Sequence, residues 1–165
     1  MRLYIVRHGI AFPHGSPGFE ENDRPLTDEG IEKMKRAAKG LRALEVVPDL
    51  ILSSPLPRAR QTAEIVIAQM SGKAKLELTE NLSPAGNRRD LYAELRGSKE
   101  LGSVMLVGHQ PSLGEIAGEI AWGSADHYVE LKKGGACCLD LVTLQPRPRG
   151  TLLWLVSPSI LRALA

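Results

Sequence analysis

The feature that most constrains this chain is the alternation of short, wholly apolar runs with longer segments of helical periodicity. The apolar runs are Leu3–Val6, Leu50–Leu52 and Val104–Val107, and each precedes a stretch whose apolar residues recur every three or four positions. Strands buried on both faces read as continuous apolar runs, and helices between them form the crossovers of a parallel sheet. We therefore expect a three-layer α/β/α fold with a mostly parallel sheet and helices on both faces.

Capping residues, prolines and glycines set the bounds of the expected helices. Thr27 can cap a helix with an acidic first turn, and Pro48 ends that segment. Pro57 suits the first turn of a second helix, which we expect to end at Gly72. The other expected elements are an edge strand at Leu76–Leu78, a short helix at Arg88–Leu95, a helix opened by Pro111, and a closing pair of strands at Ala136–Leu144 and Thr151–Val156.

Length and composition indicate one ordinary globular domain over residues 1–165. A chain of 165 residues is long enough to bury a substantial core, and it contains no internal repeat, low-complexity tract or linker. The net charge is only +2, and the basic residues are scattered, so we do not expect nucleic acid as a partner. No apolar run is long enough to span a membrane, and the N-terminal segment MRLYIVRHG has no secretory pattern. A cytoplasmic location is the expectation.

Few residues suggest a metal, a cofactor or a disulfide. His14 and His127 share no ligand spacing with the other histidines, so we expect no metal site. Neither glycine-rich nucleotide motif occurs, and no cofactor is expected. Cys137 and Cys138 are adjacent and would point to opposite faces of a strand, so we expect them to be buried and unpaired.

Charged and nucleophilic residues follow three of the apolar runs. Arg7-His8-Gly9 follows the first, Ser53-Ser54 with Arg58 follows the second, and Gly108-His109 follows the third. The carboxyl ends of parallel strands meet at one edge of a sheet, where ligands bind in folds of this class. Arginine donates two parallel hydrogen bonds to phosphate, neutral imidazole is a nucleophile, and a second histidine can donate to a charged group. The sequence therefore predicts a phosphate site at this edge.

Four motifs in the chain carry a family resemblance. They are RHG at residues 7–9, RPLT at 24–27, SSPLPRARQTAE at 53–64 and VGHQP at 107–111. With these four motifs in this order, the chain resembles the histidine phosphatase superfamily, which has the phosphoglycerate-mutase-like fold. It is most similar to the small SixA-type phosphohistidine phosphatases, which lack a large cap, because the chain is short and RPLT follows RHG closely.

The resemblance implies a role for each matching residue. His8 would be the phosphorylated nucleophile, Arg7 and Arg58 would clamp the phosphoryl oxygens, and His109 would contact the phosphate. Gly9, directly after His8, would allow the backbone to approach the substrate closely. Arg24 would complete the clamp. The alternative for Arg24 is a surface salt bridge with Asp23 or Glu21.

The segment LTENLSPAGN bears on the choice of substrate, because larger members of the superfamily carry their general acid in the corresponding region. Glu80 is its only carboxylate, and it is either that acid or a solvated loop residue. Phosphohistidine releases an imidazole, which needs far less protonation than an alkoxide does. The hypothesis is therefore a metal-independent phosphatase acting on a phosphohistidine-bearing protein, possibly a histidine phosphotransfer domain. The alternatives are a small-molecule phosphomonoesterase and a phospholigand-binding module without catalysis.

Overall fold

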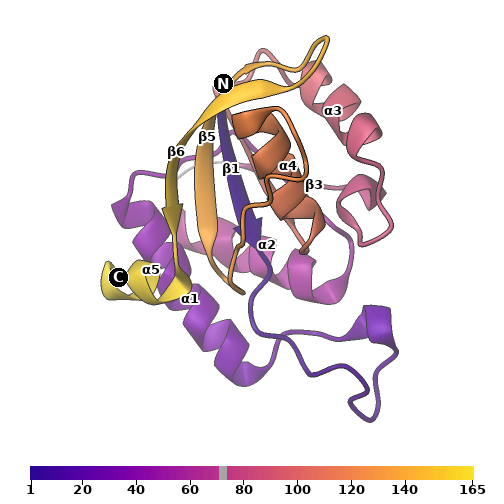
Figure 1. The fold of residues 1–165 in the computed structure, drawn as a ribbon. Helices are drawn as coiled ribbons and strands as arrows, with labels where there is room; N and C mark the ends of the chain where they lie inside the picture. Colours follow the sequence, from indigo (N-terminus) through magenta and orange to yellow (C-terminus); the bar gives the residue numbers. More distant parts are fainter. Residues whose placement is uncertain (71–73) are drawn as a thin grey trace.

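A computed structural model describes residues 1–70 and 74–165 of the chain. These residues form a six-stranded sheet in the order β3-β2-β4-β1-β5-β6 (Figure 1). The first four of these strands are parallel to one another, whereas β5 is antiparallel to both of its neighbours. The strands are β1 (Arg2–Arg7), β2 (Leu50–Ser53), β3 (Lys75–Leu78), β4 (Ser103–Gly108), β5 (Ala136–Thr143) and β6 (Arg149–Val156). The mostly parallel sheet that the sequence predicts is confirmed.

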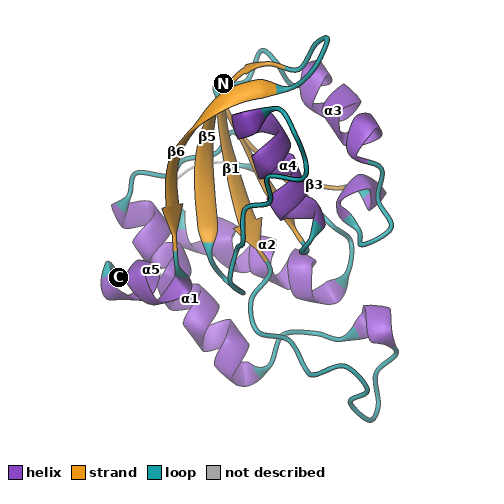
Figure 2. Ribbon diagram, in the orientation of Figure 1, coloured by secondary structure: helices purple, strands orange, loops and turns teal. Residues whose placement is uncertain are grey.

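Helices cover both faces of this sheet, which makes three layers (Figure 2). One face packs against α1 (Asp28–Ala43), α2 (Pro57–Gln69) and α5 (Pro158–Ala163), and the other against α3 (Arg88–Gly97) and α4 (Ser112–Trp122). Two single-turn 3-10 helices, η1 (Glu21–Asp23) and η2 (Glu80–Leu82), lie in loops. Successive strand residues enter opposite cores: Leu106 faces α3 and α4, whereas Val107 faces α1 and α2. This alternation explains why the buried strands read as unbroken apolar runs.

Local signals place most helix ends where the sequence predicts them. The side chain of Thr27 caps α1 by accepting a hydrogen bond of 2.9 Å from the backbone N–H of Gly30. Helix α4 begins one residue after Pro111, and Gly123 ends it in the left-handed conformation, with φ of 80°. The predicted end of the second helix at Gly72 lies outside the described residues, since α2 ends at Gln69.

Helix α5 is absent from the sequence-based prediction. Its six residues begin at Pro158, and Ser157 caps them by accepting from the backbone N–H of Ile160. The helix crosses α1 so closely that a Cβ atom at Gly40 would lie 1.9 Å from the carbonyl oxygen of Leu161. Six residues are too few to show a helical period, so only the capping signal was available.

The two cysteines lie on β5 as expected. Cys137 and Cys138 are both free and buried, and they pair with the neighbouring β1 residues Ile5 and Tyr4, which face opposite cores. Burial raises the pKa of the Cys137 thiol to about 12. Both residues therefore act as small apolar side chains of the core. Among the described residues, no helix has the length and apolarity needed to cross a membrane.

The parallel register brings the predicted strand ends together. Arg7 pairs with Gly108 across β1 and β4, and Ser53 pairs with Val107 across β2 and β4. The residue that follows each strand therefore emerges at the same edge of the sheet. That edge carries the candidate site.

Candidate functional site

A cavity of ≈ 310 Å³ opens at the carboxyl ends of β1 and β4, beside the start of α2. It contains five of the residues that the sequence predicts for the site. The lining residues are Arg7, His8, Pro13, His14, Arg24, Arg58, Pro84, His109, Gln110 and Lys133. Four of these side chains are cationic at neutral pH, and no carboxylate is among the described lining residues. Such a cavity is suited to an anion.

His8 lies at the buried end of this cavity, with 7% of its surface exposed. Its backbone N–H donates to the carbonyl of Gly108 at 3.0 Å, which ties the end of β1 to the end of β4. Its Nδ1 atom lies 2.7 Å from the carbonyl oxygen of Gly9. Because a carbonyl oxygen only accepts, Nδ1 carries the proton, and in the neutral ring Nε2 has the free electron pair. His8 is therefore held in the tautomer that a nucleophile requires.

His109 is equally buried and approaches His8 from the neighbouring strand. The two ring centroids are 5.1 Å apart, and His109 Nε2 lies 3.0 Å from the hydroxyl of Ser54. The Ser54 hydroxyl is 3.5 Å from that of Ser83, which in turn donates to Glu80 at 2.8 Å. This series of contacts fixes the orientation of the His109 ring.

Burial and nearby positive charge keep both histidines neutral. Burial lowers the pKa of His8 to about 3; the hydrogen bond to Gly9 opposes this shift, and the electrostatic effects of His109, Arg58 and Arg7 add to it. Burial likewise lowers the pKa of His109 to about 4, with Arg58 and Arg7 adding to the shift. A neutral His8 is available to attack at physiological pH.

Arg7 and Arg58 each hold a buried donor without a partner. The Nε atoms of both side chains are inaccessible to solvent and make no hydrogen bond within residues 1–70 and 74–165. Arg7 uses Nη1 to donate to the carbonyl of Leu131 at 2.8 Å, and Arg58 lies in the first turn of α2. Burial lowers the pKa of both guanidinium groups, although arginine stays charged. Buried unpaired donors are costly, and an anion bound between them would remove that cost.

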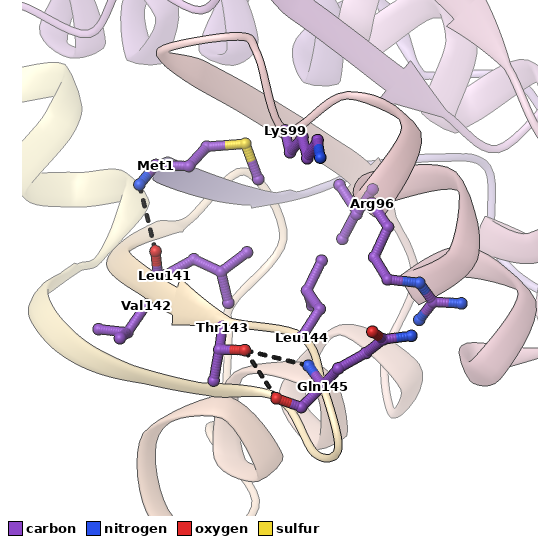
Figure 3. A pocket seen from close by; sticks show the side chains of 9 residues that line it. Met1, Arg96, Lys99, Leu141, Val142, Thr143, Leu144 and Gln145 are labelled. Carbon is purple, nitrogen blue, oxygen red and sulfur yellow. Dashed lines mark hydrogen bonds between the residues drawn. The ribbon is translucent and has the colours of Figure 1, made fainter.

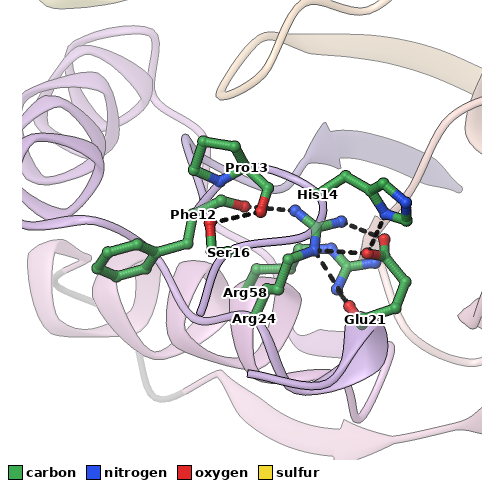
Figure 4. Close-up of polar contacts among 7 residues, drawn as sticks. All are labelled: Phe12, Pro13, His14, Ser16, Glu21, Arg24 and Arg58. Carbon is green, nitrogen blue, oxygen red and sulfur yellow. Dashed lines mark hydrogen bonds and ion pairs between the residues drawn. The ribbon is translucent and has the colours of Figure 1, made fainter. Parts of the chain in front are cut away.

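Arg24 combines the two roles that the sequence left open. It lines the cavity, and it also forms an ion pair with Glu21. The alternative partner, Asp23, forms no ion pair among the described residues. His14 reaches the same Glu21 carboxylate from the other side (Figure 4). The hydrogen bond from Arg24 lowers the pKa of Glu21, with His14 adding to the effect.

Gly9 and Glu80 do not line the cavity. The backbone N–H of Gly9 donates to the hydroxyl of Thr62 at 3.0 Å, and this hydroxyl donates to the carbonyl of Arg58 at 2.7 Å. A Cβ atom at Gly9 would lie 3.3 Å from Leu26, so the missing side chain makes room for the packing beside α1. Thr62, from the RQTAE part of the third motif, thus joins the two elements that carry His8 and Arg58.

Sequence reasoning missed several lining residues, chiefly His14, Gln110 and Lys133. It weighed His14 only as a metal ligand. Among the residues that the structure describes, no group of three or more His, Cys, Asp or Glu side chains is placed to hold a metal ion. The missed residues lie in loops, where no periodicity indicates which side chains will meet.

A second cavity lies beside Met1, before the start of β1. Figure 3 shows the side chains that line it. The cavity measures ≈ 430 Å³, and the residues around it include Met1, Leu95 and Leu144. Met1 precedes β1, whereas His8 follows it, so the length of the strand separates this cavity from the histidine pair. None of the residues that the sequence predicts for the site lines this cavity.

Comparison with known families identifies the group to which these features belong. A model of the histidine phosphatase superfamily (branch 1) matches residues 3–86. The chain belongs to this superfamily. The matched range contains Arg7, His8, Arg24 and Arg58, and His109 lies beyond it. The superfamily supports a phosphatase, and hence a hydrolase, as the general activity.

Relatives of the chain match over its whole length. An uncharacterized protein of Picosynechococcus is 39% identical over 96% of this chain and 97% of its own length. The phosphohistidine phosphatase SixA of Escherichia coli is 27% identical over 98% of this chain and 97% of its own length. A structure of the protein histidine phosphatase SixA complexed with tungstate superposes with a TM-score of 0.82, at 27% identity over 96% of this chain and 98% of the other. This superfamily member therefore has the SixA fold, as its short sequence predicts.

Proposed function

We propose that this protein is a metal-independent phosphatase that removes phosphate from phosphohistidine on another protein. The observation that carries the proposal is the state of His8. Its Nδ1 proton is bound by Gly9 and its Nε2 electron pair is free. Its cavity is lined by Arg7 and Arg58, whose Nε donors have no partner among the described residues. Nucleophile and anion clamp thus occur in one cavity, and the similarity to SixA proteins supports the same activity.

The reaction proceeds in two displacements at phosphorus. In the first, His8 Nε2 forms a bond to phosphorus, and the bond to the leaving group breaks in line with the attack. Arg7 and Arg58 bind the equatorial oxygens, and His109 stabilises the negative charge on the transferring group. In the second, water attacks the phosphorus atom held on His8, and the bond from phosphorus to Nε2 breaks. Orthophosphate leaves, and the His8 ring returns to its neutral form.

The chemistry of the leaving group favours phosphohistidine as the substrate. No carboxylate is among the described residues that line the cavity, and the Glu80 carboxylate accepts a hydrogen bond from Ser83. An imidazole leaving group needs much less protonation than an alkoxide does. The cavity opens to solvent beside the exposed side chain of His14, so it can admit a side chain presented by another protein.

The test compares substrates side by side. Purified protein is incubated with a phosphorylated histidine phosphotransfer domain and with a panel of alkyl and aryl phosphates, and orthophosphate release is measured for each. We expect the phosphohistidine protein to give the largest kcat/KM, and His8→Ala to abolish its turnover. Equal or faster turnover of alkyl phosphates would show a phosphomonoesterase instead. Tight binding of the phosphoprotein without any turnover would show a binding module.

A further inference from the structure

The position of His8 fixes where a leaving group must lie. His8 is at the buried end of the cavity, with 7% of its surface exposed. In-line displacement places the leaving group opposite the attacking Nε2, and hence on the solvent side of the phosphoryl group. A proton donor for that group must therefore be a lining residue at the exposed mouth.

His14 is at this mouth. Its side chain is 83% exposed, and it lines the same cavity as His8. Its Nδ1 atom is hydrogen-bonded to the Glu21 carboxylate (Figure 4), which leaves Nε2 as the ring nitrogen free to meet a substrate. A carboxylate paired with one ring nitrogen fixes the orientation of an imidazole.

The contacts of Glu21 tie His14 to the arginines of the cavity. The Glu21 carboxylate also binds Arg24, and its backbone carbonyl accepts from Arg58 Nη1 at 3.5 Å. The loop that carries His14 is further held by the backbone N–H of Phe12, which donates to the carbonyl of Pro25 at 3.0 Å. His14 is therefore positioned relative to the clamp, even though it is exposed.

The other lining residues are less suited to supply this proton. Arginine keeps its proton, proline and glutamine have none to transfer, and a lysine ammonium is a weaker acid than an imidazolium ion. His8 is the nucleophile, and His109 is buried beside it with Nε2 bound to Ser54. Histidine is the side chain that readily gives and takes a proton near neutral pH, and His14 is the remaining one in the cavity.

We propose that His14 is the general acid and base of this site. As His8 Nε2 bonds to phosphorus and the leaving-group bond breaks, the Nε2 proton of His14 passes to the leaving atom. The neutral His14 then takes a proton from the water that attacks phosphorylated His8, which restores both rings as orthophosphate departs. The inference rests on the proposed attack by His8, and it adds phosphate esters with basic leaving groups as slower substrates beside phosphohistidine.

The test measures single-turnover phosphorylation of His8 by 4-nitrophenyl phosphate and by phenyl phosphate, whose leaving group is more basic. His14→Gln keeps a side chain that can donate to Glu21 but has no transferable proton. We expect this variant to lower the rate with phenyl phosphate about hundredfold, within the usual range for general acid catalysis, and the rate with 4-nitrophenyl phosphate less than about threefold. Free imidazole should restore phenyl phosphate turnover in His14→Ala. His127→Ala, which alters an exposed histidine outside the cavity, is the matched control.

An equal loss with both esters would assign His14 to binding or structure and would overturn the proposal. So would an unchanged rate with phenyl phosphate, or a wild-type protein that phenyl phosphate cannot phosphorylate at all. Failure of the proposed function gives a different result. In that case the wild-type protein would take phosphate from these esters onto His8 but would not dephosphorylate a phosphohistidine protein, and the comparison of His14 variants would still stand.

Discussion

The imidazole rings of His8 and His109 lie with their centroids 5.1 Å apart and their planes inclined at 53°. The contact follows from the register of the sheet, because Arg7 and Gly108, the residues before the two histidines, are direct partners across parallel strands. Each ring has one nitrogen fixed by a neighbour: Gly9 binds Nδ1 of His8, and Ser54 binds Nε2 of His109. The pair therefore leaves one nitrogen of each ring without a partner among the described residues.

The first prediction concerns the nucleophile. Incubation with a phosphodonor followed by rapid quenching should trap a phosphoryl group on His8, because Nε2 is free and the ring is neutral. The label should be labile in acid and stable in base, and peptide mapping should place it on residue 8. His8→Ala should remove the label, and His127→Ala should keep it. A label that persisted in His8→Ala would refute the covalent assignment.

The second prediction concerns the arginine clamp. Arg58→Ala should lower kcat/KM by a factor that corresponds to the loss of about 3 kcal/mol of transition-state stabilisation. This is the loss typical of removing a preorganised donor. Arg24→Ala should cost less, because Arg24 is already paired with Glu21 at the mouth. Arg60→Ala is the matched control, since Arg60 lies on the same helix and pairs with the exposed Glu64. Near-normal turnover by Arg58→Ala would show that the phosphate binds elsewhere.

The third prediction links the two histidines to acid stability. Their pKa values are about 3 and about 4 in the folded protein, below the ordinary value for histidine. Between about pH 6.5 and those values the unfolded chain binds more protons than the folded protein does. The free energy of unfolding therefore falls as the pH falls. From pH 7 to pH 5 the loss should be about 2 kcal/mol for each histidine, measured by urea unfolding.

Two variants isolate that contribution. In His8→Asn, an amide N–H replaces the Nδ1 donor, and in His109→Gln the amide can still bond to Ser54; neither amide titrates. Each variant should therefore lose about 2 kcal/mol less than the wild type between pH 7 and pH 5. His127→Asn is the control at an exposed site. An unchanged pH dependence in both variants would mean that these histidines are not buried in their neutral form.

The elements that the sequence predicted well are those with a strong local pattern. Buried parallel strands must be apolar at every position, so β1, β2 and β4 could be found from their composition alone. The rule that ligands bind at the carboxyl ends of such strands then brought Arg7, His8, Arg58 and His109 together. The structure places all four of them around one cavity.

What could not be predicted depends on loop conformation. The contact between His14 and Glu21 joins residues of a segment without periodicity, and nothing in their spacing distinguishes it from the other possible pairs. For Arg24 the sequence left two alternatives, a phosphate ligand or a surface salt bridge. In the structure the same side chain pairs with Glu21 and also lines the cavity. Gly9 was expected near the substrate, but its backbone N–H binds Thr62, a contact that depends on how α2 packs beside β1.

The fourth prediction concerns metals. The charge of a bound phosphate would be met by Arg7 and Arg58, and the structure shows no cluster of three or more potential metal ligands among the described residues. Turnover of a phosphohistidine protein should therefore be unchanged after treatment with EDTA and gel filtration. A loss of activity that a divalent cation restored, while buffer alone did not, would contradict the arginine-based clamp.

The last prediction separates Glu80 from the proton transfer. Its carboxylate accepts a hydrogen bond of 2.8 Å from Ser83 and does not line the cavity, so Glu80→Gln leaves an acceptor for the same bond. We expect this variant to change phosphohistidine turnover by less than about tenfold, or about 1.4 kcal/mol. Ser54→Ala should cost more, because it removes the direct partner of His109. Single-turnover phosphorylation of His8 near neutral pH is the measurement, since slow dephosphorylation then cannot mask the effect. If Glu80→Gln destroyed activity toward alkyl phosphates and spared phosphohistidine, Glu80 would be the acid, His14 would not, and the protein would be a general phosphomonoesterase.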